Sequence, residues 1–262
     1  MEILVMGSGT SHGVPMIGCR CEVCLSPNPK NRRFRPSILV RHDDKTILID
    51  TTPELRLQAL AWDVREVDAI LFTHTHADHI FGLDDVRRFN DLSGREMPVY
   101  GDRNTLDDIR RIFPYIFAQT QAGGGKPKIS LNLVEPEFEL FGLKISSFYV
   151  LHGTLPVLAY RFDQPASDGC PAKSAAYVTD VSVIPPDSMT RLHSLDLLLL
   201  DAVRFEPHVT HFGLYQALEV IEELKPKLSY LTHLSHHFDH DKVNAELPKN
   251  VELSYDGLRI RL

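Results

Sequence analysis

The sequence predicts an α/β fold in which two strand-rich halves form one compact unit. Short apolar runs such as "DAILFT" (68–73) and "LDLLLLD" (195–201) have the length and composition of buried strands. Segments such as "GLYQALEVIEEL" (213–224) place apolar residues at helical spacing. Neither an internal repeat nor a long linker divides the 262 residues, so we expect a single domain over 1–262.

The first half alternates strands with helices. Pro53 stands near the start of one expected helix, where proline is tolerated, and Pro114 is expected to interrupt another. The expected strands are 2–7, 37–42, 46–50, 68–73 and 97–101, and the expected helices are 52–62, 82–92 and 105–117.

The second half contains more strands. A glycine-rich insertion near 118–128 precedes it, and "VELSYDGLRIRL" (251–262) is expected to form a hairpin that turns at Asp256-Gly257. The remaining expected strands are 129–135, 138–140, 143–152, 155–162, 174–180, 195–201 and the start of 227–237.

Composition narrows the possible functions. The net charge of -7, from 28 Lys+Arg and 35 Asp+Glu, argues against a partner of long nucleic acid, which is bound through many basic contacts to phosphate. Apolar stretches of ~18 residues are absent from the sequence, so we expect no membrane partner. "MEILVMGSGTSHG" has no basic segment and is interpreted as a strand, not a signal peptide. We therefore expect a cytoplasmic protein.

"FTHTHADHIFG" (72–82) concentrates titratable side chains: His74, His76, Asp78 and His79. Two histidines separated by one residue lie on the same side of an extended segment, and the next two polar residues follow as the chain turns. Burying such groups without partners would cost roughly 2–7 kcal/mol each. Imidazole and carboxylate ligands suit Zn, Mn or Fe ions, so the stretch predicts a metal site that needs further ligands.

Those further ligands stand where later strands end. His152 ends "FYVLH", Asp180 ends "AAYVTD", and His233 follows "SYLT". The ends of strands are the usual place for functional groups in α/β proteins. We therefore expect these three residues to join the histidine motif.

Three cysteines form a second candidate site. Cys19, Cys21 and Cys24 occur in "GCRCEVC", and clustered cysteines in a cytosolic protein favour metal binding over disulfides. Three thiolates nearly complete a tetrahedral zinc site and need one more ligand. Isolated Cys170 is expected to be a small buried apolar residue.

"THTHADHIFG" resembles the H-x-H-x-D-H motif of the metallo-β-lactamase superfamily, and Asp50 matches the early aspartate of that family. The resemblance implies a four-layered αββα sandwich with two divalent ions, Mn or Zn, between the sheets. Asp78 would also orient the attacking hydroxide. By this resemblance one ion is held by His74, His76 and His152, the other by Asp78, His79 and His233, and Asp180 bridges them.

Three further stretches resemble the PhnP subgroup of phosphodiesterases, which open cyclic phosphates of ribose. They are "GTSHGVPMIGCRCEVC", "HFGLYQAL" and "LTHLSHHFD". The resemblance implies that His211 assists catalysis and that His236 completes a structural zinc site within a loop at 18–36. His237 and His240 lie close by, so the choice of the fourth ligand stays open.

The expected function is metal-dependent hydrolysis of a small anionic phosphodiester, such as a ribosyl cyclic phosphate or a cyclic nucleotide, by a metal-bridging hydroxide. The resemblance also suggests a homodimer. The alternatives are another hydrolase of this fold, such as a tRNase Z-like nuclease, a cyclic-nucleotide phosphodiesterase, a thioesterase or a lactonase, and a non-catalytic PqqB-like carrier. Fold alone does not choose among them.

Overall fold

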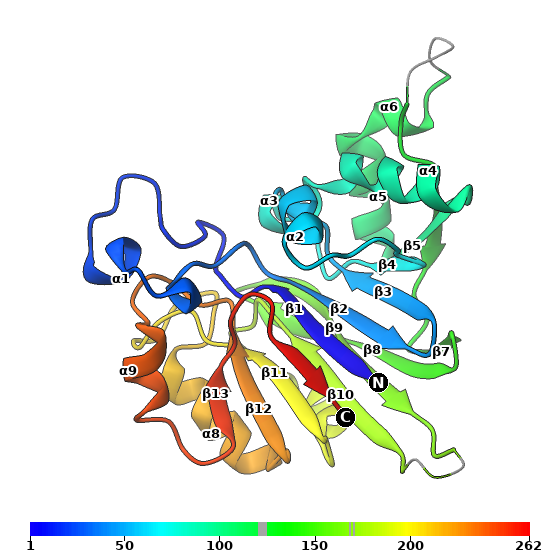
Figure 1. Ribbon diagram of the computed structural model, residues 1–262. Coiled ribbons are helices and arrows are strands. Elements are labelled where there is room, and N and C mark those ends of the chain that lie inside the picture. Colours follow the sequence, from blue (N-terminus) through cyan, green and yellow to red (C-terminus); the bar gives the residue numbers. More distant parts are fainter. Residues whose placement is uncertain (120–124, 168, 170) are drawn as a thin grey trace.

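The computed structural model describes residues 1–119, 125–167, 169 and 171–262. Two seven-stranded sheets lie face to face, and helices cover the outer face of each (Figure 1). The four-layered αββα sandwich expected from the sequence is therefore confirmed.

The first sheet has the order β14-β1-β2-β3-β4-β5-β6, and the second has the order β13-β12-β11-β10-β9-β8-β7. The strands of the first are β1 (Glu2–Gly7), β2 (Ser37–His42), β3 (Lys45–Ile49), β4 (Ala69–Leu71), β5 (Met97–Gly101), β6 (Ile129–Leu133) and β14 (Arg259–Arg261). Those of the second are β7 (Glu137–Leu140), β8 (Leu143–His152), β9 (Leu155–Gln164), β10 (Lys173–Val178), β11 (Leu197–Asp201), β12 (Leu228–Thr232) and β13 (Val251–Leu253).

Helices form the two outer layers. The first sheet is covered by α2 (Leu55–Ala61), η2 (Leu83–Val86), α4 (Arg87–Ser93), α5 (Arg103–Ile112) and α6 (Pro114–Phe117). The second is covered by α7 (Pro186–Met189), η3 (Thr190–Leu192), α8 (Leu214–Leu224) and α9 (His240–Asn244). Three short helices lie in loops: α1 (Glu22–Leu25), η1 (Pro29–Asn31) and α3 (Ala77–Ile80).

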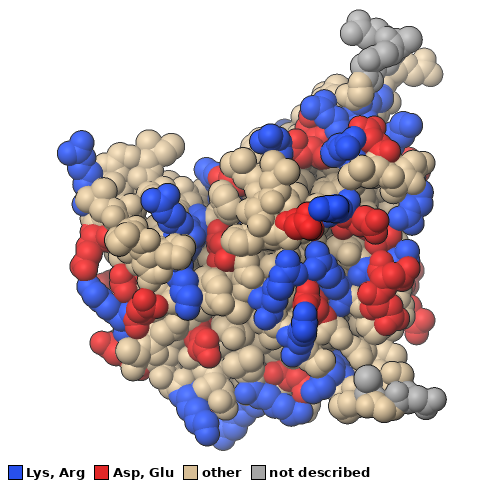
Figure 2. Space-filling view, viewed as in Figure 1, with Lys and Arg blue, Asp and Glu red and all other residues tan. Residues whose placement is uncertain are grey.

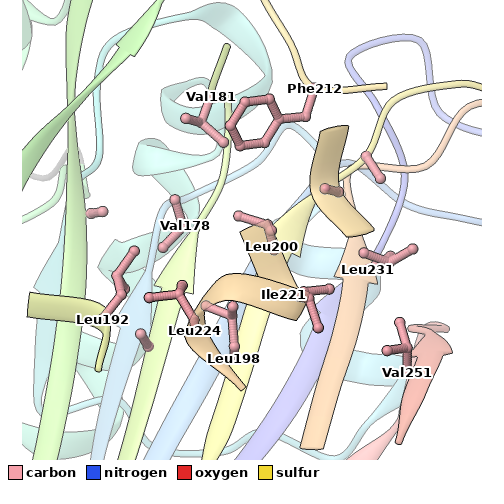
Figure 3. Packing of buried hydrophobic residues seen from close by; sticks show 14 of the residues in the cluster. Val178, Val181, Leu192, Leu198, Leu200, Phe212, Ile221, Leu224, Leu231 and Val251 are labelled. Carbon is pink, nitrogen blue, oxygen red and sulfur yellow. The ribbon is translucent and has the colours of Figure 1, made fainter. Parts of the chain in front are cut away.

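Alternating side chains explain why both faces of each sheet are buried. In β1, Leu4 and Met6 pack against the helices, while Ile3 and Val5 pack against the second sheet. In the second sheet, Leu198 and Leu200 of β11 lie under α8, as Figure 3 shows. Burial of each large aliphatic side chain contributes about 1.5–3 kcal/mol, so the three apolar interfaces hold the four layers together.

Parallel pairing brings the functional strand ends to one edge. Strands β3, β4 and β5 run parallel, as do β10, β11 and β12. The two sheets are tied near this edge, because Tyr160 Oη donates to Phe72 O at 2.6 Å and Leu158 N donates to Thr73 O at 3.0 Å. Residues that follow β4, β10 and β12 therefore meet in one place.

Proline marks the helix boundary that the sequence predicts. The expected helix 105–117 is divided at Phe113 and Pro114 into α5 and α6. The expected helix 82–92 begins as the 3₁₀ helix η2 and continues as α4. Of the expected insertion at 118–128, residues 120–124 lie outside the described residues, as does Cys170.

The prediction that residues 251–262 form a hairpin is wrong. β13 pairs with β12 in the second sheet, whereas β14 pairs with β1 in the first. Both carboxylate oxygens of Asp256 accept hydrogen bonds from elsewhere: Ser8 N at 2.8 Å, Ser8 Oγ at 2.7 Å and Phe34 N at 2.6 Å. The turn expected at Asp256-Gly257 is present, because Leu258 N donates to Tyr255 O at 3.1 Å, but it leads the chain across to the first sheet. Asp256 therefore fastens a crossover between the sheets.

Replacing Asp256 tests that role. Asp256→Ala should lower the free energy of unfolding by about 1–3 kcal/mol, because it leaves the N–H groups of Ser8 and Phe34 without their acceptor. The matched control is Asp44→Ala, whose side chain is 85% exposed, and it should stay within about 0.5 kcal/mol. Urea denaturation measures both, and equal values would show that Asp256 only occupies a surface turn.

Candidate metal centre

The histidine motif folds onto itself directly after β4. His76 has extended backbone and precedes α3, whose first turn carries Asp78 and His79. The imidazole of His74 lies 4.5 Å from that of His76 and 4.2 Å from that of His79, measured between ring centroids. The extended pair followed by a helical turn therefore gathers all four side chains, as the sequence predicts.

Two of the later residues adopt a left-handed backbone conformation. Asp180 follows β10 with φ of 52°, and His233 follows β12 with φ of 59°. Asp50, which follows β3, has φ of 64°. Positive φ is uncommon outside glycine, although Asp and His tolerate it better than most residues. Each strand thus turns sharply at its end, and strain of this kind is concentrated at functional sites.

Asp180 lies at the centre of the group. Its Oδ2 is 3.8 Å from His74 Nε2, while its Oδ1 is 3.2 Å from His79 Nε2 and 3.4 Å from His233 Nε2. Asp78 Oδ2 approaches the same two nitrogens, at 3.4 Å from His79 and 3.8 Å from His233. One carboxylate therefore faces two sets of imidazoles, which is the disposition of a bridging ligand.

His152, the last residue of β8, lies beside His74 and His76. Its ring lies 5.1 Å from that of His76 and 6.0 Å from that of His74. It also lies 4.5 Å from the ring of His211, and one ligand atom of each of His152, His211 and Asp180 falls within 4.8 Å of the others. The geometry therefore brings His211 close enough to share this part of the site.

Buried atoms without partners test whether metal ions fit here. Among the described residues, the orphaned atoms include His74 Nε2, His79 Nε2, His233 Nε2 and Asp78 Oδ2, all of which face Asp180 or one another. Leaving such atoms unpaired is costly. Because imidazole nitrogen and carboxylate oxygen are preferred zinc and manganese ligands, cations between these atoms would satisfy them together.

Electrostatics also favour cations. Burial alone would lower the pKa of His79, but Asp180, Asp78 and Asp50 outweigh it and raise that pKa well above its usual value. Burial opposes the shift at His233 too, yet Asp180 and Asp78 raise its pKa to about 9. Without bound cations, the imidazoles of His79 and His233 would therefore be protonated. Metal binding displaces such protons and leaves imidazole neutral.

Second partners fix how two ligand histidines are oriented. His79 Nδ1 lies 2.7 Å from Asp50 Oδ2, which also accepts Thr73 Oγ1 at 2.8 Å. His152 Nδ1 donates to Thr210 O at 2.6 Å. Both contacts leave Nε2 as the free nitrogen, which is how outer partners set the tautomer of a metal-ligating histidine. Thr210 acts through its carbonyl, so the sequence carried no signal for it.

Asp201 is the main residue that sequence reasoning missed. It is fully buried at the end of β11, and its Oδ2 accepts Val181 N at 3.0 Å and lies 2.8 Å from His211 Nδ1. Its Oδ1 lies 3.7 Å from His233 Nδ1. The signal was present, because Asp201 ends an apolar strand just as Asp180 does. Asp201 therefore orients His211 and borders His233.

The three cysteines meet one histidine from the far end of the chain. Cys19 Sγ and Cys21 Sγ each lie 3.3 Å from His236 Nδ1, and the ligand atoms of these residues and Cys24 fall within 4.8 Å of one another. Ligands of a zinc tetrahedron are about 3.5–3.8 Å apart, so the four atoms suit a closed zinc site. His237 Nδ1 instead contacts Ser235 Oγ at 2.9 Å, and His240 Nε2 lies 2.9 Å from Asn244.

Local hydrogen bonding prepares one thiol for a metal. Burial would raise the pKa of Cys21, but the N–H of Cys24 and the imidazole of His236 outweigh burial and lower that pKa to about 6. Burial raises the pKa of Cys24 to about 11. A bound cation would deprotonate such a thiol outright.

Hydrogen bonds tie the cysteine loop to the segment bearing His233. The buried guanidinium of Arg33 donates to Ser235 O at 2.9 Å and to Phe238 O at 2.8 Å. Leu234 N donates to Ser8 O at 2.8 Å, and Thr10 N donates to Leu234 O at 3.1 Å. The N-terminal segment therefore holds the loop 233–238 from both sides.

The chain matches a known protein family over most of its length. A β-lactamase superfamily domain matches residues 45–234, which include every predicted residue of the histidine and carboxylate cluster. The chain belongs to the β-lactamase superfamily. The match leaves out residues 18–36, so the single domain over 1–262 and its zinc-binding loop stay predictions.

Individual relatives refine this assignment. A crystal structure described as a new diphosphatase from the PhnP family is 43% identical, with a TM-score of 0.89 over 99% of this chain and 96% of that one. Zn²⁺-bound PqqB from Methylobacterium extorquens is 17% identical with a TM-score of 0.79 over 100% of both chains, which shows the fold alone. The family and the first likeness support a metal-binding hydrolase.

A curated relative is named for a different activity. An octanoyltransferase of Porphyromonas gingivalis is 36% identical over 98% of this chain, but the chain spans only 51% of that protein's length. The name describes a protein about twice as long as the matched part. It therefore does not assign octanoyl transfer to this chain.

Two neighbouring histidines provide a matched test of the cysteine site. His236→Ala should remove about one zinc per chain and lower the melting temperature, because it opens the tetrahedron, whereas His237→Ala should change neither. Cys21→Ser should behave like His236→Ala. Elemental analysis and thermal melting of the same preparations measure these effects. Equal zinc content in all of the variants would argue against a metal site here.

Proposed function

We propose that this protein is a metal-dependent hydrolase of small phosphodiesters. The observation that carries the proposal is the convergence of buried, unpartnered imidazole and carboxylate atoms around Asp180. The 43% identity to a PhnP-family diphosphatase supports phosphorus as the reacting centre. Two divalent ions, Mn or Zn, would occupy the centre, and a third, structural Zn would occupy the cysteine site.

The seven ligands divide into two sets around the bridge. His74, His76 and His152 would hold one ion, and Asp78, His79 and His233 the other, with Asp180 between them. Such ions polarise a phosphoryl oxygen and lower the pKa of bound water toward 7. Four buried acids, Asp50, Asp78, Asp180 and Asp201, would balance the charge of two divalent cations.

Asp78 is proposed to orient the attacking water. Its Oδ2 has no hydrogen-bond partner among the described residues although it is buried, so it is available to accept a hydrogen bond from a neighbouring water. Burial would raise the pKa of Asp78, but His79 and His233 outweigh it and hold that pKa well below its usual range. The carboxylate is therefore an acceptor at neutral pH.

His211 is proposed to act at the leaving oxygen. Its Nδ1 is held by Asp201, which leaves Nε2 to carry a proton toward the substrate. A buried carboxylate behind an imidazole fixes its orientation and stabilises the charged ring. His211 is therefore suited to protonate the leaving group as the P–O bond breaks.

Surface charge bears on the choice of substrate. Figure 2 shows Lys and Arg interspersed with Asp and Glu over the face in view, with some basic side chains gathered near its middle. A nuclease for tRNA would favour a broad basic arm that contacts phosphates. The net charge of -7 argues against such an arm. A small anionic substrate is therefore preferred over the tRNase Z-like alternative.

A diphosphate is the second candidate substrate. The PhnP-family structure at 43% identity is described as a diphosphatase. A phosphoanhydride and a phosphodiester present the same phosphoryl centre to the metals and differ in the group that leaves. Both substrates therefore fit the same residues.

The proposal includes a homodimer and a cytoplasmic location. No helix of the described chain is long and apolar enough to cross a membrane.

A substrate panel tests the proposal. Ribosyl cyclic phosphates, 2′,3′- and 3′,5′-cyclic nucleotides, bis(p-nitrophenyl) phosphate and a nucleoside diphosphate should be assayed with Mn and with Zn, beside a lactone and a thioester. Turnover of a phosphate substrate alone supports the proposal. Turnover of the lactone or thioester alone would favour the other hydrolases. A protein that binds only the structural zinc would be a PqqB-like carrier.

Removal of a ligand tests the metal centre. His76→Ala and Asp180→Ala should each lower metal content and reduce kcat to near background, since each opens a ligand set. The control His193→Ala, an exposed histidine outside the cluster, should keep both. Metal analysis and steady-state kinetics decide the matter, and near-normal kcat of either variant at saturating metal would contradict the assignment.

His211 should affect chemistry but not metal. His211→Ala should keep full metal occupancy and lose about 10²–10⁴-fold in kcat. Asp201→Asn preserves an acceptor for Val181 N but not the carboxylate behind His211, and should lose about 10–100-fold. A fall in metal content of His211→Ala would instead make His211 a ligand beside His152.

A further inference from the structure

The loop between β11 and α8 is closed at its base by hydrogen bonds. Val203 N donates to Phe212 O at 3.0 Å, and Leu214 N donates to Arg204 O at 2.8 Å. The guanidinium of Arg204 also donates to Pro207 O at 2.7 Å. These bonds join the two ends of residues 204–213, called here the histidine loop.

The histidine loop forms one wall of the candidate metal centre. Thr210 O accepts His152 Nδ1, and the next residue is His211. A side chain at Gly153 would come within 3.1 Å of Thr210 Cγ2, so the loop lies tightly against the turn after β8. Val209 at its tip is 87% exposed. His208, beside that tip, therefore stands at the boundary between the site and solvent.

Hydrogen bonding sets the tautomer of His208. Thr210 N lies 3.3 Å from His208 Nδ1 and, because a backbone N–H only donates, Nδ1 is the acceptor. Thr210 Oγ1 lies 3.1 Å from the same nitrogen. The proton of the imidazole is therefore on Nε2. Nothing in the described part of the chain accepts it, and Nε2 is absent from the buried orphaned atoms, so this N–H is open to solvent.

Three imidazoles run outward from the bridge. His233 lies beside Asp180, His211 lies 4.7 Å from His233, and His208 lies 5.3 Å from His211, between ring centroids. His208 is therefore the neighbour of the residue proposed to act at the leaving oxygen. A leaving group that contacts His211 would lie within reach of His208.

We propose that His208 binds the leaving group, its Nε2–H donating to an oxygen of a second phosphoryl group. The inference rests on the proposed function and names its substrate class, a diphosphate whose outer phosphate leaves. An anionic oxygen fits a solvent-facing donor without an acceptor, because hydrogen bonds to charged groups are the stronger ones. Arg204 on the same loop adds a cation to this rim.

Two variants of His208 distinguish a contact with the substrate from a structural role. His208→Ala removes the donor, whereas His208→Gln places an amide N–H near the position of Nε2. His193→Ala is the matched control. For a nucleoside diphosphate, His208→Ala should raise KM about 10–100-fold with a smaller change in kcat, the factor expected for a hydrogen bond to a charged group. His208→Gln should recover most of the loss.

Two further readouts complete the test. Hydrolysis of bis(p-nitrophenyl) phosphate, which has no second phosphoryl group, should change by less than about 3-fold, and metal content should not change. Binding of a methylene-bridged nucleoside diphosphate, measured by calorimetry, should weaken by the same factor as KM rises. These readouts separate substrate contact from a role in shaping the metal centre.

Four outcomes would overturn the inference. They are an unchanged KM for the diphosphate, equal losses on both substrates, a loss of metal, and wild-type turnover of the diester without turnover of the diphosphate. The last would leave the proposed function intact. Absence of turnover of every phosphate by the wild-type protein would overturn the proposed function, and this inference with it.

Discussion

The buried carboxylate of Asp180 is the constraint around which the rest of the centre is arranged. It is 2% exposed, adopts a left-handed backbone conformation, and faces imidazoles that come from both sheets. A buried charge is tolerated only when it is paired, so the two sheets must bring His74, His79 and His233 to it together. Cations shared with these imidazoles would turn a costly arrangement into a stable one.

A second set of acids explains why the imidazoles can be so close. Asp50 holds His79 through the ring nitrogen that faces away from Asp180, and Asp201 holds Nδ1 of His211. Each acid stands at the end of a buried strand, where the rigid sheet fixes its position. The ends of the strands therefore orient the imidazoles of His79 and His211, although neither histidine lies in a strand.

The N-terminal segment and the loop 233–238 are joined by hydrogen bonds. His233 and His236 are three residues apart, one facing Asp180 and the other facing Cys19 and Cys21. Arg33 braces the same loop through two backbone carbonyls. Loss of a metal ion from the proposed cysteine site would thus loosen His233, a proposed ligand of the other centre, and would link stability to the proposed activity. Loops that are otherwise free to move seldom position ligands well.

The sequence patterns alone determined an α/β fold of two strand-rich halves and the residues gathered around Asp180, because apolar periodicity and a short histidine motif are local patterns. The αββα sandwich itself was implied by the resemblance of that motif to the metallo-β-lactamase superfamily. Only the tertiary structure distinguished His236 from His237 and His240 as the neighbour of the cysteines, separated the strands at 251–262 into two sheets, and placed Asp201 behind His211. The contact of His152 with Thr210 could not be predicted from the sequence, because Thr210 contributes its backbone carbonyl. These features are contacts between distant segments, and such contacts depend on how strand ends meet in space and not on neighbouring residues.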